Sequence, residues 1–300
     1  MGSSAVNDRA NRESSPPESL APAFAALAED LRRDDRDRYL TALLAPEEAR
    51  AGLIALYAFN QEIARIRETV SESLIGRMRL QWWRDRLDDI FAGRPPRHPV
   101  AEPLAWAVSR HGLDRALFDA ILEAREADMD DAQPDDLAAL IAYARATSAP
   151  VMQLALQVLG ARQGEGADSA AEAALAQALT GLMRALPFQL RGRRLMLPAD
   201  LCREAGLDAG RLYDRGPGVE PAALARVVGQ VAAQAASALA EARRRGVSRR
   251  LLPALLPARL AARDLKRLAR AGHNPFDSRV LAPDGLRPMV LLWARLTGTF

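Results

Sequence analysis

Residues 55–68 read ALYAFNQEIARIRE, and this stretch decides the fold. Its large apolar residues recur at spacings of 3, 4 and 3 positions: Leu56, Phe59, Ile63 and Ile66. That spacing puts them on one face of an α-helix, and such a face is stable only when it packs against other elements. The stretch therefore predicts an amphipathic helix that follows Pro46 and contributes to a buried core.

The helical pattern continues along most of the chain from about Leu20 onward. Ala, Leu, Arg and Glu dominate, β-branched residues are sparse, and prolines and glycines separate segments of ordinary helix length. We expect one all-α domain over residues 20–300. Residues 1–19 are rich in Ser, Asn and Pro with almost no large apolar residue, which predicts a disordered N-terminal tail.

The composition excludes several classes of protein. The 41 basic and 38 acidic residues are interspersed and leave a net charge of only +3, so nothing indicates a nucleic-acid partner. The single Cys202 excludes an internal disulfide and fits a reducing compartment. No apolar run reaches the ~18 residues of a membrane span, and the N-terminus lacks a secretory signal pattern. We expect a cytoplasmic protein and leave open a peripheral attachment to the inner membrane.

Residues 174–191 predict a second important helix. One face is a stripe of large apolar residues: Leu175, Leu179, Leu182 and Leu186. Another is a stripe of small residues: Ala174, Ala178, Gly181 and Ala185. Small side chains let a neighbouring helix or a ligand approach the backbone closely, so both outcomes are open for this face.

Several segments, in this order, resemble the squalene/phytoene synthase superfamily over most of residues 35–285. The matching segments are Asp37–Tyr39 up to Pro46, Ala55–Phe59, Arg79–Trp83, Tyr143, Leu179–Arg184 and Gly192–Pro198. The resemblance implies an isoprenoid-synthase-like helical bundle around a central cavity that holds two prenyl diphosphates. It also implies that two facing helices each supply an aspartate motif of the DxxxD type.

The motif has a simple physical purpose. Carboxylates at positions i and i+4 share a helix face and can grip Mg²⁺, which neutralises the diphosphate as it leaves. In this chain, the aspartate positions of the first motif are Ala64 and Glu68, and those of the second are Ala185 and Gln189. The first motif's diphosphate-binding arginine corresponds to Gln61. We therefore expect no metal, no cofactor and no catalytic residue.

Some groups at these positions could still bind a ligand. The candidates are Tyr57, Gln61, Glu68, Tyr143, Arg184 and Arg191. Arginines can replace a metal by binding phosphate directly through paired hydrogen bonds. The alternative is that Arg184 and Arg191 pair with acidic neighbours, and we favour this structural role.

A narrower resemblance concerns residues 58–83. They look like the branch of the superfamily that lacks the aspartate motifs and contains the mitochondrial complex I assembly factor. This likeness implies a non-catalytic protein that supports assembly of respiratory complex I, with complex I subunits or other assembly proteins as partners. Two alternatives stay open. One is a divergent prenyltransferase that condenses farnesyl or geranylgeranyl diphosphate with Mg²⁺ held partly by Glu68, and the other is a metal-independent prenyl-lipid binder.

Other charged clusters predict no chemistry. Asp85, Asp88 and Asp89 alternate with arginines as on a solvated helix face, and Asp128, Asp130 and Asp131 suggest a helix end. The three histidines, His98, His111 and His273, are scattered and are expected on the surface or in loops. Arginines at 243–245 and 249–250 precede a Leu-rich segment whose regular helix is expected to start near Pro257. That cluster either touches anionic lipid or forms the exposed start of a bundle helix, and we favour the second.

Overall fold

The computed structural model describes residues 16–94, 96–130, 132–218 and 220–300, and these residues fold into a bundle of helices with no β-strand among them. The elements are η1 (Glu18–Leu20), α2 (Ala21–Asp34), α3 (Arg36–Leu43), α4 (Glu47–Ala64), η2 (Arg67–Thr69), α5 (Ser73–Phe91), α6 (Ala101–His111), α7 (Arg115–Glu126), η3 (Ala127–Asp130), α8 (Leu137–Val158), α9 (Ala167–Arg191), α10 (Ala199–Ala205), α11 (Ala209–Arg215), α12 (Pro221–Arg245), α13 (Leu252–Arg270), α14 (Ser278–Leu281) and α15 (Arg287–Thr297). The predicted all-α class and single domain are confirmed. The tail prediction falls largely on residues 1–15, which lie outside the described residues, while Glu18–Leu20 forms a short 3₁₀ turn.

The predicted helix after Pro46 is α4, and its apolar face is in the core. Leu56 and Phe59 are fully buried, and Ile63 and Ile66 are 2% and 3% exposed. Phe59 makes an edge-on contact with Trp83 of α5, with ring centroids 5.1 Å apart. This packing joins α4 to α5 and places the C-terminal end of α4 beside the turn between α2 and α3.

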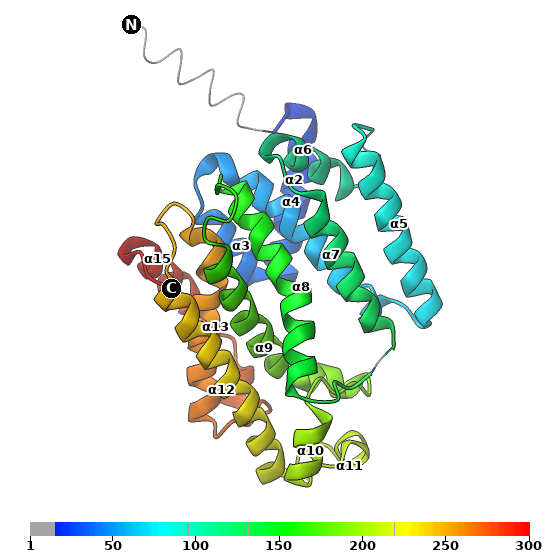
Figure 1. Ribbon diagram of the computed structural model, residues 1–300, viewed down its shortest axis with the longest axis vertical. Coiled ribbons are helices and arrows are strands. Elements are labelled where there is room, and N and C mark those ends of the chain that lie inside the picture. The colour runs from blue at the N-terminus through cyan, green and yellow to red at the C-terminus, as the bar shows by residue number, and fades with distance from the viewer. Residues whose placement is uncertain (1–15, 95, 131, 219) are drawn as a thin grey trace, which may run out of the picture.

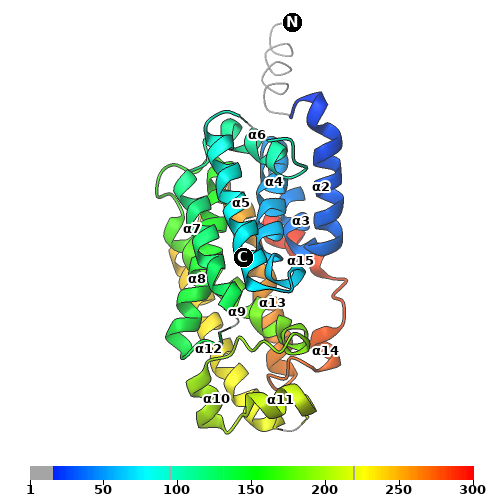
Figure 2. The same ribbon diagram turned by 90° about the vertical axis from the view of Figure 1, so that its right-hand side faces the viewer.

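Helix α9 runs through the bundle and packs along α8, α12 and α13 (Figures 1 and 2). Its contact side is rich in small residues, since Ala173, Ala174 and Ala176 are fully buried. Small side chains allow the neighbouring helices to approach closely. The core is therefore packed by close helix backbones as well as by leucine side chains.

Helices α12 and α13, which both pack along α9, bear on two expectations from the sequence. Among the described residues, α12 alone is long and apolar enough to cross a membrane, but half of that stretch is buried inside the fold and it packs along α9. The expected start of a helix near Pro257 is wrong, because α13 begins at Leu252. Pro253 lies in the first turn, where a missing N–H costs nothing, and Pro257 is accommodated within the helix.

Candidate functional site

The positions that match the first aspartate motif line a pocket of about 480 Å³ at the C-terminal end of α4. The lining residues come from α4, the segment after it and the α2–α3 turn: Arg33, Asp34, Asp35, Arg38, Asn60, Gln61, Ala64, Arg65 and Glu68. The structure thus brings Gln61, Ala64 and Glu68 to one pocket, but not on one helix face as expected, because α4 ends at Ala64 and Glu68 lies in η2. Gln61 and Ala64 are half-buried and Glu68 is exposed.

Ion pairs occupy much of this pocket's wall. Asp35 accepts from Nη1 of Arg38 at 2.7 Å, and its other carboxylate oxygen caps α3 by accepting from the backbone N–H of Arg38. Asp34 pairs with Arg65 at 2.8 Å and with Arg33 at 3.0 Å. The carboxylates that flank Ala64 are therefore already neutralised by guanidinium groups.

The acidic side chains of the pocket do not form a metal cage. Within the part of the chain that the structure describes, no three His, Cys, Asp or Glu side chains converge closely enough to hold a metal ion. Mg²⁺ prefers about six oxygen ligands in near-octahedral geometry. Ala64 supplies no ligand atom, so the side chains present do not fit the metal–diphosphate site that the resemblance implies.

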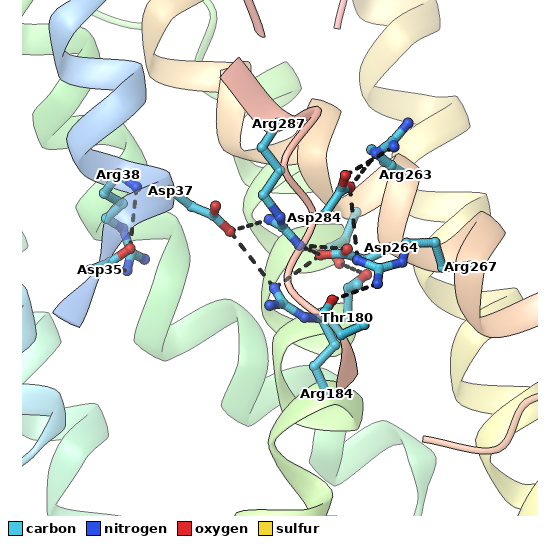
Figure 3. Close-up of polar contacts among 12 residues, drawn as sticks. Asp35, Asp37, Arg38, Thr180, Arg184, Arg263, Asp264, Arg267, Asp284 and Arg287 are labelled. Atoms are coloured by element: carbon cyan, nitrogen blue, oxygen red, sulfur yellow. Dashed lines mark hydrogen bonds and ion pairs between the residues drawn. The ribbon is translucent and has the colours of Figure 1, made fainter. Parts of the chain in front are cut away.

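The second motif lies on α9, and its surviving arginine is tied to other helices (Figure 3). Nη1 of Arg184 is 2.9 Å from Asp264 of α13 and 3.7 Å from Asp37 of α3. Arg287 of α15 also binds both of these aspartates. Four helices therefore meet at one cluster of two arginines and two aspartates.

The centre of this cluster is the pair of Arg287 and Asp264. Nη2 of Arg287 donates to both carboxylate oxygens of Asp264, at 2.6 and 2.8 Å. Burial alone would lower the pKa of Arg287, but Asp37 and Asp264 outweigh it and raise that pKa, so the guanidinium stays charged. Arg184 is therefore already paired with acidic side chains of its own chain, although its side chain is 42% exposed.

Tyr143, another candidate, belongs to a separate buried network. Its hydroxyl donates to Asp128 at 2.6 Å, and Nη1 of Arg125 donates to Asp128 at 3.0 Å. Nη2 of Arg194 is 3.6 Å from the same carboxylate. Burial is the main cause that raises the pKa of Tyr143 to about 12, so the phenol remains protonated and donates.

Asp128 shows what the sequence interpretation missed. The helix-end assignment for this acidic run is correct in part, since η3 follows α7. The Asp128 side chain, however, is 6% exposed, and both of its carboxylate oxygens accept hydrogen bonds. Its partners lie on α7, α8 and the segment after α9. Arg125 is only three positions away, but Tyr143 and Arg194 are remote in sequence, so the sequence around Asp128 does not indicate the whole network.

The remaining candidates lie apart from one another. Tyr57 is 2% exposed, burial raises its pKa to about 12, and the Arg38 guanidinium lies 5.8 Å from its ring centroid. Arg191 stacks over the exposed Phe188 at 5.5 Å. Gln189 stabilises the segment after α9, since its backbone carbonyl accepts from the N–H of Arg194 at 2.9 Å. These geometries describe structural contacts, and ligand binding by these residues stays a prediction.

One side of α9 remains open where the second motif would lie. Gly181 is exposed, and a Cβ added there would meet nothing within 4 Å. Ala178 and Ala185 on the same side are half-buried. Arg184, three positions after Gly181, is the exposed polar residue beside these small residues.

The histidines are placed more deeply than expected. His98 is in a loop, as predicted, but it lies half-buried against the rings of Trp82 and Trp83, at 5.0 and 5.5 Å. His111 is the last residue of α6 and is half-buried beside Gly52 and Trp106. His98 Nε2 lies 3.9 Å from Glu62 Oε1, but among the described residues neither histidine belongs to a group of three possible metal ligands.

The chain is similar in sequence to a family of known proteins. Residues 31–287 match the family model of squalene/phytoene synthase. The chain is similar to the complex I assembly factor 6 of Bos taurus, an NADH dehydrogenase (ubiquinone) assembly factor, at 38% identity over 177 residues, which cover 59% of this chain and 53% of the relative. It is also similar to the phytoene synthase of Cereibacter sphaeroides, at 28% identity over 189 residues, which cover 61% of this chain and 53% of the relative. The chain thus spans about half the length of the curated relatives it matches.

Solved structures show the same fold. A dehydrosqualene synthase in complex with ligand aligns with a TM-score of 0.79 at 19% identity, covering 94% of this chain and 98% of that one. Squalene synthase HpnC from Alicyclobacillus acidocaldarius aligns with a TM-score of 0.75 at 21% identity, covering 88% of this chain and 99% of that one. At such identities the likeness concerns the fold alone. The match of the family model to most of the chain shows that this protein belongs to the squalene/phytoene synthase family.

Proposed function

We propose that this chain is a non-catalytic member of the family that supports assembly of respiratory complex I. The observation that carries the proposal is that Arg184 makes ion pairs with aspartates of its own chain. Ala64 and Ala185 stand at the positions of metal-binding aspartates, and Arg184 is held by Asp264 and Asp37. The likeness to complex I assembly factor 6 supports a role in the assembly of complex I.

The losses act together against catalysis. Prenyl-diphosphate ionisation needs positive charge that is free to stabilise the leaving diphosphate. Of the four positions that match the aspartates of the two motifs, Glu68 alone carries a carboxylate, since the others are Ala64, Ala185 and Gln189. An enzyme with these groups would have to open the Arg184 cluster and recruit a metal with one ligand, which is energetically unfavourable.

The first test measures chemistry. Purified protein is incubated with farnesyl or geranylgeranyl diphosphate and Mg²⁺ or Mn²⁺, with and without NADPH, and diphosphate release is followed beside an active phytoene synthase. We expect no release above the protein-free rate. Release that disappears in Glu68→Ala would show that the chain is a divergent prenyltransferase. Retention of a prenyl lipid in EDTA, without turnover, would instead support the lipid-binding alternative.

The second test measures the cellular role. In a strain lacking the gene, we expect less assembled complex I on native gels and lower NADH-dependent respiration, with normal isoprenoid levels. Wild-type protein and the Glu68→Ala variant should restore both readouts equally, because no carboxylate chemistry is involved. Missing isoprenoids with normal complex I would contradict the proposal.

A further inference from the structure

The C-terminal helix α15 is apolar on both of its sides. Its inner side places Leu291 and Ala294 in the core against α13. Its outer side exposes a stripe of large apolar residues, each between 50% and 67% exposed: Leu286, Met289, Leu292, Trp293 and Leu296. A helix that is apolar all round is normally covered on all sides. Because α15 lies at the edge of the bundle (Figure 1), this exposed stripe points to a docking surface.

The surroundings of the stripe are basic. Residues 285–300 contain no Asp or Glu. Arg249 donates to the backbone carbonyl of Leu296 at 2.7 Å, and Arg295 donates to the carbonyl of Leu44 at 3.2 Å. A carbonyl is neutral, so these bonds fix the two guanidinium groups without cancelling their charge. Fixed positive charge beside an apolar stripe with a tryptophan suits an anionic lipid surface.

Other charges nearby are already balanced or mixed. Arg244 and Arg245 pair with Glu241, and Arg250 pairs with Glu165 at 2.8 Å. Glu47 and Glu48 begin α4 close in sequence to Leu44, and they offset part of the basic charge at that end. The charge argument therefore depends on Arg249 and Arg295, which border the C-terminal half of the stripe.

Two other occupants fit less well. The first fifteen residues of the chain are mostly polar, with Met1 and Val6 as their only large apolar residues, so they could not cover five large side chains. A second copy related by a twofold axis would bring identical patches together. Both copies would present Arg249 and Arg295 and, within residues 285–300, no acidic side chain, so neither copy would offer the other an opposite charge.

We propose that α15 docks on an anionic lipid surface. The helix has 11 residues, about 16 Å at 1.5 Å per residue, so it lies in the plane of the interface and does not span the bilayer. Met289, Leu292 and Trp293 enter the boundary between headgroups and acyl chains, while Arg249 and Arg295 contact lipid phosphates. This role goes beyond assembly of complex I and does not depend on it.

The test is co-flotation of the full chain with vesicles. Anionic vesicles, made of phosphatidylcholine with about 30% phosphatidylglycerol, should bind the protein. Vesicles of pure phosphatidylcholine should bind it much more weakly. The Leu292→Glu/Trp293→Glu variant should lose about a hundredfold in binding, because two apolar anchors become charged. Arg249→Gln keeps a donor for Leu296 and should lose about fivefold.

Controls separate docking from other effects. Leu74→Glu/Met78→Glu introduces the same charges on α5, at side chains that are 65% and 64% exposed, and should bind vesicles like the wild type. Helical circular dichroism and the melting temperature check that each variant folds. No binding to anionic vesicles, or unchanged binding by the Leu292→Glu/Trp293→Glu variant, would overturn the proposal. The proposal would also be overturned if light scattering showed that the wild type is a dimer and that the Leu292→Glu/Trp293→Glu variant is a monomer.

Discussion

Arg184 and Asp264 lie 2.9 Å apart, between Nη1 and Oδ2, and their ion pair joins α9 to α13. By resemblance, this arginine belongs to the second metal-binding motif, where its charge would face a diphosphate. Here an aspartate of the same chain takes that place, and Arg287 binds the same carboxylate from α15. This arginine therefore connects α9 to α13, and Arg287 connects the same aspartate to α15.

Asp264→Asn tests how much this cluster contributes to stability. The Asp264 side chain is 6% exposed and that of Arg287 is 10% exposed, so the substitution leaves a buried guanidinium facing a neutral amide. Breaking one side of a buried ion pair leaves an uncompensated charge. We expect the free energy of unfolding to fall by about 3 kcal/mol, measured by urea denaturation.

The control for this substitution is Asp30→Asn. Asp30 pairs with Arg33 at 2.8 Å, but both side chains are more than half exposed. Water replaces the lost contact there, so the unfolding midpoint should not change. Equal effects of the two substitutions would show that the Asp264 cluster has no special role in stability.

Tyr143→Phe tests the second network. The change keeps the ring and removes the hydroxyl that donates to Asp128 at 2.6 Å. Asp128 keeps Arg125 and Arg194, so the loss should be limited to one hydrogen bond to a charged group, about 1–2 kcal/mol in the free energy of unfolding. Tyr213→Phe is the control, because the contact of Arg193 with that ring does not need the hydroxyl. A Tyr143→Phe variant as stable as the wild type would contradict this account.

The fold could be predicted because its determinants are local. The 3–4 spacing of Leu56, Phe59 and Ile63 indicates which face of α4 is buried, and the structure buries all three. Ile66 continues the spacing and is buried too, although α4 ends before it, at Ala64. The start of α13 was wrong by five residues because two prolines, Pro253 and Pro257, fit in one helix where the pattern suggested a break. Such tolerance depends on packing around the first turns, which sequence spacing does not encode.

The pairing of Arg184 with acidic residues was predicted, but its partners could not be named because they are remote in sequence. Asp37 and Arg287 are 250 positions apart, and nothing near either residue indicates the other. The aspartate positions of the lost motifs could be identified from the resemblance alone. What replaced the metal is determined by tertiary contacts between α3, α9, α13 and α15, and only the structure shows it.

Gly52→Ala tests a close approach inside the bundle. A Cβ at Gly52 would lie 2.6 Å from Nε2 of His111 and 2.9 Å from Cγ1 of Val158. In a free helix, Ala is better than Gly by about 1 kcal/mol, but overpacking a core costs about 1–3 kcal/mol. We expect a net loss of stability, measured as a lower midpoint in urea. Gly181→Ala is the matched control, since the added methyl group meets open space and should stabilise α9 by about 0.5–1 kcal/mol.

His111 makes stability depend on pH. Burial, helped by the neighbouring Arg110, lowers the pKa of His111 to about 4, whereas an unfolded histidine has a pKa near 6.5. Between these values the unfolded chain binds more protons than the folded one, so the free energy of unfolding falls as the pH decreases from 6.5 towards 4. The full shift would correspond to about 3 kcal/mol, and partial exposure of the ring reduces the expected loss to about 1–2 kcal/mol.

Urea unfolding at pH 7 and pH 5 measures this loss in the wild type and in His111→Leu, which lacks the titrating group but keeps an apolar contact with Trp106. The difference between the two proteins isolates His111 from the carboxylates, which titrate in both. Equal pH dependence in the two proteins would show that the histidine is solvated and that its burial between α4 and α6 has no effect on stability.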